Sequence, residues 1–403
     1  MDLSSFFEDE VVYKPNVVDS ADIQTVDFPI IETIDDVLPA IQGRDEFIVA
    51  DRGDYKIINY VVNTPDTFPE VKTTKDALLR ECRGLTFYPD GRVMRRLFHK
   101  FFNLNEKLEN LVENVDFSKR HRVLMKLDGS MISPLFINGE VRWGTKMGLT
   151  ETAVDAENFA KARPQYDALA LECEKFGNTP IFEFCSRKNR IVLDYPEDQL
   201  ILLAIRDNKT GYYMSYDSLC FIGNMHEIPV VEEYGSESIK NIDDFVNVLR
   251  TQEGTEGVVV TFDDGHKIKI KTDWYVKIHK AKEVVTREYV LAELILQDKI
   301  DDVKPLLLKQ DLEYVEEFSA KLLKTLKKYS QQVFDFHFEK GDYLTRKEFA
   351  LGLAKQLPHI VTSAIFTTWD KHDLTFCHEV VKNMFLKNTT HQKKYEEFKK
   401  EYL

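Results

Sequence analysis

Residues 256–271 read Glu-Gly-Val-Val-Val-Thr-Phe-Asp-Asp-Gly-His-Lys-Ile-Lys-Ile-Lys, and this stretch sets the fold that we expect for most of the chain. The apolar run before the Asp-Gly turn at 264–265 and the alternating run after it are typical of two antiparallel strands joined by a tight turn. In the second strand Lys267, Lys269 and Lys271 share one face, because successive side chains of a strand point to opposite sides. Taken alone, such a strand is most simply an edge strand with solvated lysines.

Antiparallel strands are expected from about residue 45 to residue 282. Two further turn signals, at 89–91 and 138–139, are flanked by β-branched or aromatic residues in the same way. The segment 152–176 has the apolar spacing of a helix and interrupts the strands. The remaining strands are expected at 123–125, 131–136, 141–145, 181–184, 191–193 and 200–205.

The character of the sequence changes after about residue 283. Apolar residues then recur at the i, i+3, i+4 spacing of helices, and Thr-Arg-Lys-Glu at 345–348 has the form of a capping box. We therefore expect an α+β protein, with an acidic N-terminal extension at 1–45, an antiparallel-β domain with flanking helices at 46–282 and an all-helical C-terminal domain at 283–403. The helices of that last domain are expected at 284–297, 312–336, 346–356, 374–386 and 392–402.

The net charge of −14 is concentrated at the N-terminus. Residues 1–50 hold twelve Asp and Glu against Lys14 and Arg44, a net charge of −10, which leaves −4 for the other 353 of the 403 residues. The overall charge therefore does not exclude a nucleic-acid partner. Because the chain has no run of 18 apolar residues, no signal-peptide pattern and five scattered cysteines, we expect a cytoplasmic protein with reduced thiols and no membrane span.

The stretch Lys126-Leu127-Asp128-Gly129-Ser130 places a lysine beside a carboxylate and a glycine that lets the backbone pass close to a ligand. A lysine becomes a nucleophile when its amine is neutral, and neighbouring ammonium groups and partial desolvation both favour the neutral form. Such a pentapeptide is a weak motif alone. Asp128 has two open roles: it orients Lys126, or it orients a leaving group through a metal.

Several other charged residues have both a structural and a functional interpretation. Glu256 begins the hairpin described above, where its carboxylate and the lysines across the turn could bind a phosphate and a divalent metal together. Glu183 is either an exposed acid of a strand or a pocket acceptor for a ribose hydroxyl or a metal-bound water. Arg83 is either a surface charge or a planar donor to phosphate. The sequence around Lys146 does not decide between a structural and a functional role. The segment Lys-Phe-Phe-Asn at 100–103 is either the edge of a core strand with a solvated lysine, or a base-stacking aromatic residue beside a cation.

In their order along the chain, these residues follow the motif series of the covalent nucleotidyltransferases, which include ATP-dependent ligases and mRNA capping enzymes. The sequence closely resembles the T-even phage RNA ligase 1 family over about residues 45–282, and weakly beyond. The acidic lead is longer than that family's usual start. The segments that carry the resemblance are Glu-Cys-Arg-Gly at 81–84, Lys-Phe-Phe-Asn-Leu-Asn-Glu at 100–106, Asn-Arg-Ile-Val-Leu at 189–193 and Lys-Ile-Lys-Thr-Asp-Trp-Tyr-Val at 269–276.

The resemblance implies roles for individual residues. Lys126 would carry the nucleotide as lysyl-AMP, Glu183 would contact the ribose and Glu256 would assist metal binding near the nucleotide. Asp301, in Ile-Asp-Asp-Val at 300–303, looks like part of that family's acidic, metal-associated segment. The other implied contacts are Lys269 and Lys271 on the α-phosphate, Arg83, Lys100 and Lys146 on other phosphates or the substrate end, and Tyr60 and Tyr275 beside the nucleotide.

The resemblance also implies an activity: an RNA ligase that uses ATP and Mg²⁺, or Mn²⁺, to join 5′-phosphate and 3′-hydroxyl ends of single-stranded RNA or nicked tRNA in RNA repair. It would act as a monomer in the cytoplasm, which is the host's if the protein is phage-encoded. The lysine-rich segment 267–282 is a candidate for part of the groove that binds a strand end. A DNA ligase or capping enzyme is disfavoured because the segment that follows is helical, and a non-catalytic RNA-end binding module is disfavoured because Lys126 and the paired lysines are present.

Overall fold

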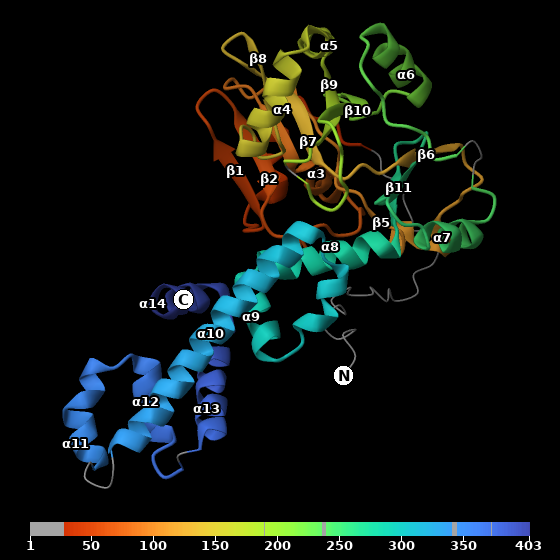
Figure 1. Ribbon diagram of the computed structural model, residues 1–403. Coiled ribbons are helices and arrows are strands. Elements are labelled where there is room, and N and C mark those ends of the chain that lie inside the picture. The colour runs from red at the N-terminus through yellow and green to blue at the C-terminus, as the bar shows by residue number, and fades with distance from the viewer. Residues whose placement is uncertain (1–27, 189, 236–238, 341–344, 372) are drawn as a thin grey trace. The chain divides into compact units, whose positions relative to one another are not determined.

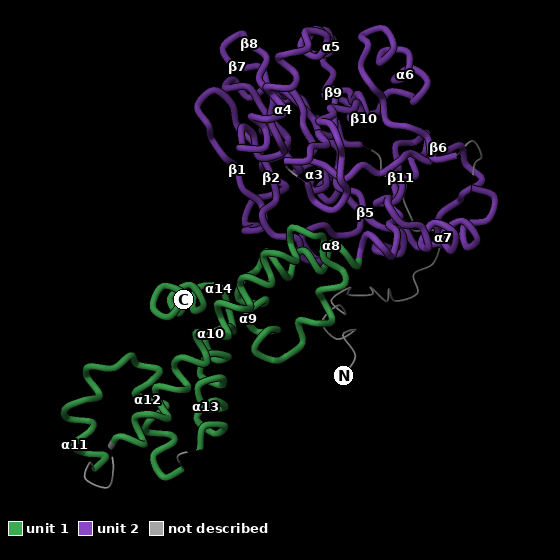
Figure 2. Tube along the Cα trace, viewed as in Figure 1, with its two compact units in different colours: residues 1–8, 277–403 green, residues 9–276 purple. Residues whose placement is uncertain are grey.

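The computed structural model describes residues 28–188, 190–235, 239–340, 345–371 and 373–403, and the chain forms two compact units (Figures 1 and 2). We call the described residues 28–276 the β unit and residues 277–403 the helical unit. The division falls inside helix α8 (Asp273–Thr286). The chain is α+β with antiparallel sheets and many helices, as expected.

The described part of the β unit holds three four-stranded sheets, and all of their strand pairs are antiparallel except that between β12 and β5 (Figure 1). The first sheet has the order β1 (Phe47–Asp51), β2 (Lys56–Tyr60), β3 (Arg83–Phe87), β4 (Val93–Arg95). The second has the order β10 (Gln199–Asp207), β9 (Asn178–Cys185), β7 (Ser130–Ile137), β8 (Glu140–Gly144). The third has the order β5 (Phe102–Asn103), β12 (Lys267–Lys271), β11 (Gly257–Phe262), β6 (His121–Met125).

The three predicted hairpins are confirmed, since the turns at 89–91, 138–139 and 264–265 join β3 to β4, β7 to β8 and β11 to β12. The edge-strand interpretation of the lysine strand is wrong, because β12 lies between β11 and β5. The strand predicted at 191–193 is absent. There the backbone N–H groups of Val192 and Leu193 donate to the carboxylate of Asp128 instead of to a neighbouring strand.

Helices flank the sheets of the β unit. The helix predicted at 152–176 is two helices, α4 (Glu151–Lys161) and α5 (Pro164–Lys175), because Pro164 starts the second one. A proline is tolerated in the first turn of a helix but breaks its interior. The other helices of four or more residues described in this unit are α2 (Leu38–Ile41), α3 (Thr74–Glu81), α6 (Tyr216–Met225) and α7 (Ile242–Arg250).

The predicted N-terminal extension does not end at residue 45. Residues 1–27 lie outside the described residues, but Ile31 and Val37 are fully buried and belong to the same hydrophobic core as Phe47 and Ile58 of the first sheet. Residues 28–45 are therefore an integral part of the β unit.

The described residues of the helical unit form no strands and share one hydrophobic core. The predicted capping box at 345–348 is confirmed, with the Thr345 and Glu348 side chains capping each other's backbone N–H groups. Helix α12 was not predicted, because its β-branched residues have low helix propensity, and it is stabilised by packing against α10 and α13. Among the described residues, no helix has both the length and the apolar character to cross a membrane. The helices are α9 (Glu288–Leu296), α10 (Lys309–Lys340), α11 (Arg346–Leu351), α12 (His359–Thr367), α13 (Leu374–Lys387) and α14 (Gln392–Tyr402).

A buried ion-pair cluster joins the first two sheets. Glu81, the last residue of α3, accepts hydrogen bonds of 2.8 Å from both terminal nitrogens of Arg206 on β10 and one of 3.0 Å from Nε of Arg96, which follows β4. All three side chains are almost completely buried. Burial alone would raise the pKa of Glu81, but Arg206 and Arg96 hold that pKa well below its ordinary value.

We predict that Glu81→Gln lowers the free energy of unfolding by about 3–5 kcal/mol at pH 7, because it leaves two buried guanidinium groups without their anion. The loss is measured by urea denaturation. Because the pKa is depressed in the folded state, the stabilisation by Glu81 is complete above the unfolded pKa of about 4.3 and is lost as the pH falls below it. The difference between the variant and the wild type should therefore shrink in acid. The exposed Glu113→Gln is the matched control, and an equally small effect of both variants would contradict the role of the cluster.

Candidate active site

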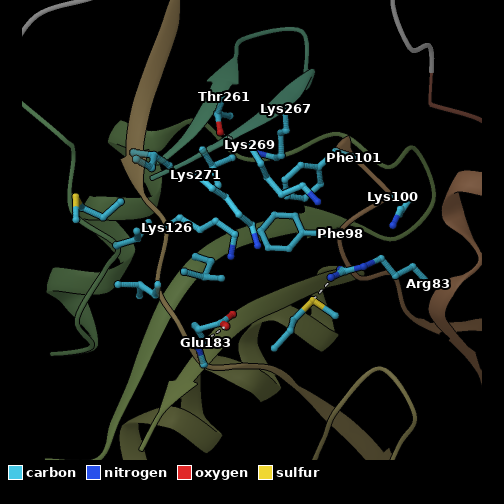
Figure 3. A pocket seen from close by; sticks show the side chains of 18 of the residues that line it. Arg83, Phe98, Lys100, Phe101, Lys126, Glu183, Thr261, Lys267, Lys269 and Lys271 are labelled. Carbon is cyan, nitrogen blue, oxygen red and sulfur yellow. Dashed lines mark hydrogen bonds between the residues drawn. The ribbon is translucent and has the colours of Figure 1, made fainter. Parts of the chain in front are cut away.

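A cavity of about 350 Å³ lies in the β unit, and charged side chains from several elements are directed into it (Figure 3). Its apolar lining comes from several elements, among them β6 with the loop that follows it, β11, β10 and the segment 98–101. Six cationic side chains and one carboxylate line it, a balance that suits a polyanionic ligand with an apolar part. The charged lining residues are Arg83, Lys100, Lys126, Lys267, Lys269, Lys271 and Glu183.

The pentapeptide containing Lys126 follows β6 and is held by close backbone contacts. The N–H of Lys126 donates to the carbonyl of Gly257 at 2.9 Å, which fixes the loop to the start of β11. A Cβ atom at Gly129 would lie 2.4 Å from the carbonyl oxygen of Phe184, so only glycine lets this loop lie against β9. The glycine of the motif therefore sets the depth at which Lys126 enters the cavity.

Glu256 joins the candidate nucleophile to the lysine strand. Its buried carboxylate oxygen Oε1 lies 2.7 Å from Nζ of Lys126 and 3.2 Å from Nζ of Lys271. Gly257 follows with φ +137°, and a Cβ there would lie 2.1 Å from the carbonyl oxygen of Ile270. This close approach of β11 to β12 brings one carboxylate within reach of both ammonium groups.

The geometry around Asp128 favours a positioning role. Its Oδ2 accepts the N–H groups of Val192 and Leu193 at 2.7 Å each, and its Oδ1 accepts the hydroxyl of Tyr275 at 2.7 Å. Its own N–H donates to the hydroxyl of Tyr195 at 3.0 Å. Both carboxylate oxygens are thus engaged in ordering the loop that carries the candidate nucleophile.

Tyr275 does not line the cavity, in contrast to the expected place beside the nucleotide. Its side chain is buried at the start of α8, where its hydroxyl donates to Asp128. Burial and the neighbouring carboxylates of Glu256 and Asp128 raise its pKa, so the hydroxyl keeps its proton and acts as a donor. Tyr275 is a support for the loop.

Glu183 is the one carboxylate among the lining residues. Its Oε1 accepts the N–H of Gly129 at 3.1 Å, so β9 presents it next to the pentapeptide. Burial raises its pKa to about 7; Lys126 opposes the shift and the charge of Glu256 adds to it. A cation or a hydroxyl donor placed in the cavity would favour the ionised form.

Lys269 and Lys100 are desolvated cations on the wall of the cavity. Burial lowers the pKa of Lys269 to about 7, and the charge of Lys100 adds to this effect. The ammonium of Lys269 lies 5.2 Å from the ring centre of Phe101, which also lines the cavity. Burial lowers the pKa of Lys100 as well. Both ammonium groups would be stabilised by an anionic ligand.

Tyr60, Lys146 and Arg83 form the neighbouring part of the site. Tyr60 lines the cavity, and Nζ of Lys146 lies 4.2 Å from the centre of its ring, outside the lining itself. Burial opposes ionisation of Tyr60, but Lys100, Lys146 and Arg83 together lower its pKa. Arg83 donates to the sulfur of Met131 at 3.2 Å and pairs with no carboxylate among the described residues.

Gly84 explains why this part of the site is close-packed. Its φ is +79°, and a Cβ there would lie 2.7 Å from the Cα and carbonyl oxygen of Lys146. The backbone of β3 therefore touches the turn that follows β8. A larger residue would push Lys146 away from Tyr60.

The candidate metal ligands belong to different units. Asp301 belongs to the helical unit, where its side chain is 84% exposed and pairs with Lys304 at 2.9 Å. Among the described residues, no group of three or more His, Cys, Asp or Glu could hold a metal ion by itself. Mg²⁺ is usually held by one or two carboxylates together with phosphate and water oxygens. Glu183 and Glu256 fit that pattern.

Some lining residues were not singled out from the sequence. Val259 and Thr261 face the cavity because they alternate with the buried Val258 and Val260, a period that the sequence does display. Phe98 lies in an irregular segment, where no periodicity indicates its direction. The lysines of the predicted groove 267–282 are divided: Lys267, Lys269 and Lys271 line the cavity, whereas those from 277 onward belong to the helical unit.

Comparisons with known proteins agree with this geometry. A family model described as RNA ligase matches residues 81–275, which include all the cationic lining residues. A Thermovibrio ammonificans protein assigned as an RNA ligase is 29% identical over 280 residues, which are 67% of this chain and 70% of that protein. RNA ligase 1 of bacteriophage TS2126 is 27% identical over 288 residues, 67% and 68% of the two chains.

Among solved structures, an archaeal ATP-dependent RNA ligase is similar with a TM-score of 0.45 and 14% identity, covering 72% of this chain and 78% of that one. This likeness is too distant to support an argument about the site. Residues 81–275 of the chain match the RNA ligase family model, and the two sequence relatives named above are described as RNA ligases.

Proposed function

We propose that this chain is an active ATP-dependent RNA ligase and that Lys126 is the residue that becomes adenylated. The observation that carries the proposal is the arrangement around Nζ of Lys126. It faces a cavity lined by five other cations, and it shares the carboxylate of Glu256 with Lys271. A nucleophilic amine placed among phosphate-binding cations is what nucleotidyl transfer to a lysine requires.

In the first step the polyphosphate of ATP binds to the cations, and the α-phosphate lies between Lys126 and Lys271. The lone pair of Nζ attacks the α-phosphorus, the N–P bond forms, and the P–O bond to the β-phosphate breaks as pyrophosphate leaves. Before the attack, the ammonium of Lys126 gives one proton to Glu256, which lies 2.7 Å from Nζ, so that the nitrogen gains a lone pair. The amine gives up a second proton as the N–P bond forms, and the leaving pyrophosphate accepts it.

Glu183 and Glu256 would hold a Mg²⁺ or Mn²⁺ ion together with phosphate oxygens. When bound, the ion neutralises charge that develops on those oxygens. Glu183 would otherwise accept from a ribose hydroxyl, and either partner would favour its ionised form, which burial opposes. Tyr60, Arg83, Lys100 and Lys146 supply further donors for phosphates or for the substrate end.

The adenylate is then transferred to RNA. A 5′-phosphate oxygen of the RNA attacks the AMP phosphorus and frees Lys126, which regains its proton. A 3′-hydroxyl next attacks the 5′-phosphorus, the new phosphodiester forms, and AMP leaves with the electrons of the broken P–O–P bond. We propose single-stranded RNA, nicked tRNA included, as the substrate, because the RNA ligase family joins RNA and the sequence resembles its phage branch.

Wild-type protein incubated with Mg²⁺ and α-labelled ATP should form a covalent AMP adduct that survives denaturing electrophoresis, and Lys126→Ala should form none. Lys175→Ala, a change of an exposed lysine on α5, is the matched control and should label normally. Absence of label in the wild-type protein would overturn the proposal. Sealing of single-stranded RNA but not of nicked DNA, each with a 5′-phosphate, would then separate an RNA ligase from a DNA ligase.

The affinity for a non-hydrolysable ATP analogue should fall as the pH rises through about 7, because burial lowers the pKa of Lys269 to about 7 and its positive charge is lost above that value. In Lys269→Arg the guanidinium stays charged. That variant should bind the analogue with less dependence on pH between about 6 and 8.5, as measured by calorimetry, and the dependence that remains should come from Glu183 and Lys267, whose pKa values are also about 7. Glu183→Gln should keep the part of the dependence that is due to Lys269. A wild-type affinity that does not change with pH would contradict a role for Lys269 in binding.

Tyr275→Phe should slow adduct formation several-fold while changing the KM for ATP little, because it removes a hydroxyl that supports the loop and touches no nucleotide. It should also cost about 1–3 kcal/mol of stability, since the buried Asp128 loses a donor. The rate of adduct formation is measured by quenching the labelling reaction at successive times, and the stability is measured by urea denaturation. Tyr212→Phe, at a side chain that is 55% exposed, is the control. A raised KM with an unchanged rate would instead place Tyr275 on the nucleotide.

A further inference from the structure

Lys267, at the first position of β12, is a buried cation on the wall of the cavity that the proposed reaction does not use. Lys267 is 5% exposed, and its Nζ donates to Oγ1 of Thr261 on the neighbouring strand at 3.2 Å. The ammonium lies 4.5 Å from the ring centre of Tyr213 and 5.5 Å from that of Phe98. Figure 3 shows Lys267, Thr261 and Phe98 at the cavity.

The charge of Lys267 is unbalanced. No carboxylate of the described residues forms an ion pair with it, whereas Lys126 and Lys271 share Glu256. Burial lowers its pKa to about 7, and the nearby Arg206 adds to this effect. Aromatic faces compensate only part of the cost of burying an ammonium group. An anion that enters the cavity would supply the missing partner.

The register of the hairpin separates Lys267 from the nucleophile. Gly257 pairs with Lys271 and Thr261 pairs with Lys267, so the two pairs stand four residues apart along the same strands. At about 3.3 Å per residue this is about 13 Å. The amine of Lys126 lies at the Lys271 end, bonded to the same Glu256. Lys267 is therefore placed to bind a group other than the phosphate that Lys126 would attack.

We infer that Lys267 and Thr261 form a second phosphate subsite, which binds a phosphate other than the α-phosphate of the nucleotide. The inference rests on the proposed RNA ligase function. Lys267 supplies the positive charge, and the hydroxyl of Thr261 can donate to a phosphate oxygen while its oxygen accepts from Lys267. The rings of Phe98 and Tyr213 hold the ammonium in place. The phosphate belongs either to the β,γ end of ATP or to the backbone of the RNA strand.

The test compares Lys267→Met, which removes the charge at similar length, with Lys267→Arg, which keeps it. Two assays distinguish the sources of the phosphate: reversal of the AMP adduct by pyrophosphate, and sealing of RNA that is already adenylated, without ATP. In Lys267→Met one of these reactions should weaken about tenfold, as expected for the loss of a charge-assisted hydrogen bond, and Lys267→Arg should restore most of it. Thr261→Val should weaken the same reaction by a smaller factor.

Two outcomes would overturn the inference. If Lys267→Met is folded and both reactions stay within about twofold of wild type, Lys267 serves packing alone. If Lys267→Met leaves pyrophosphate reversal and sealing unchanged but alters the preference between ATP and GTP, then Lys267 contacts the base of the nucleotide and not a phosphate. Direct calorimetric binding of inorganic pyrophosphate and of a 5′-phosphorylated oligonucleotide needs no turnover. Weaker binding of either by Lys267→Met would support the subsite even in a protein that formed no adduct, so the failure of the proposed function would be recognised separately.

Discussion

The buried carboxylate of Glu256 lies between the ammonium groups of Lys126 and Lys271, in a site where positive charges greatly outnumber negative ones. Six cations line a cavity of about 350 Å³ with only Glu183 facing them. Like charges this close repel one another and lose hydration, and both effects oppose folding. At the Lys271 end of β12, the negative charge of Glu256 offsets the repulsion between the lysines. Beside Lys267 and Lys269, aromatic rings offset part of the cost of burying the ammonium groups.

The scaffold around this charge cluster is held by close backbone contacts and buried hydrogen bonds. Glycines at 84, 129 and 257 let three pairs of backbones approach more closely than any side chain would permit. Asp128 and Tyr275 order the loop that carries Lys126, and Glu81 with its two arginines joins the first sheet to the second. Contacts of this kind keep the cations in place although each of them would gain hydration by moving outward. On the proposed function, a bound polyanion would stabilise a geometry that already exists, so binding would need little reordering.

Local pattern predicted much of this architecture. The Asp-Gly and Asn-Gly turns and the alternation of β12 were sufficient for three hairpins and for a common face of Lys267, Lys269 and Lys271. The central position of β12 could not be predicted, because its pairing with β5 joins residues more than 160 positions apart in sequence, Phe102 and Ile268. The place of Tyr275 depends in the same way on a distant partner, Asp128. Residues 191–193 have the composition of a strand, but their N–H groups bind a carboxylate that only the folded chain brings to them.

The same arrangement bears on how the proposed nucleophile would stay idle without its substrate. In the structure, Nζ of Lys126 forms an ion pair with Glu256 at 2.7 Å, and a protonated ammonium held in this way has no lone pair to offer to phosphorus until it loses a proton. Lys271 already competes for the same oxygen at 3.2 Å. An incoming α-phosphate would engage Lys271, and a divalent ion would engage Glu256, so both would act on the partners of Lys126 before acting on Lys126 itself. On the proposed function, Glu256 would therefore do more than assist metal binding. Because one carboxylate is shared between two lysines, it would couple the reactivity of Lys126 to the binding of the nucleotide.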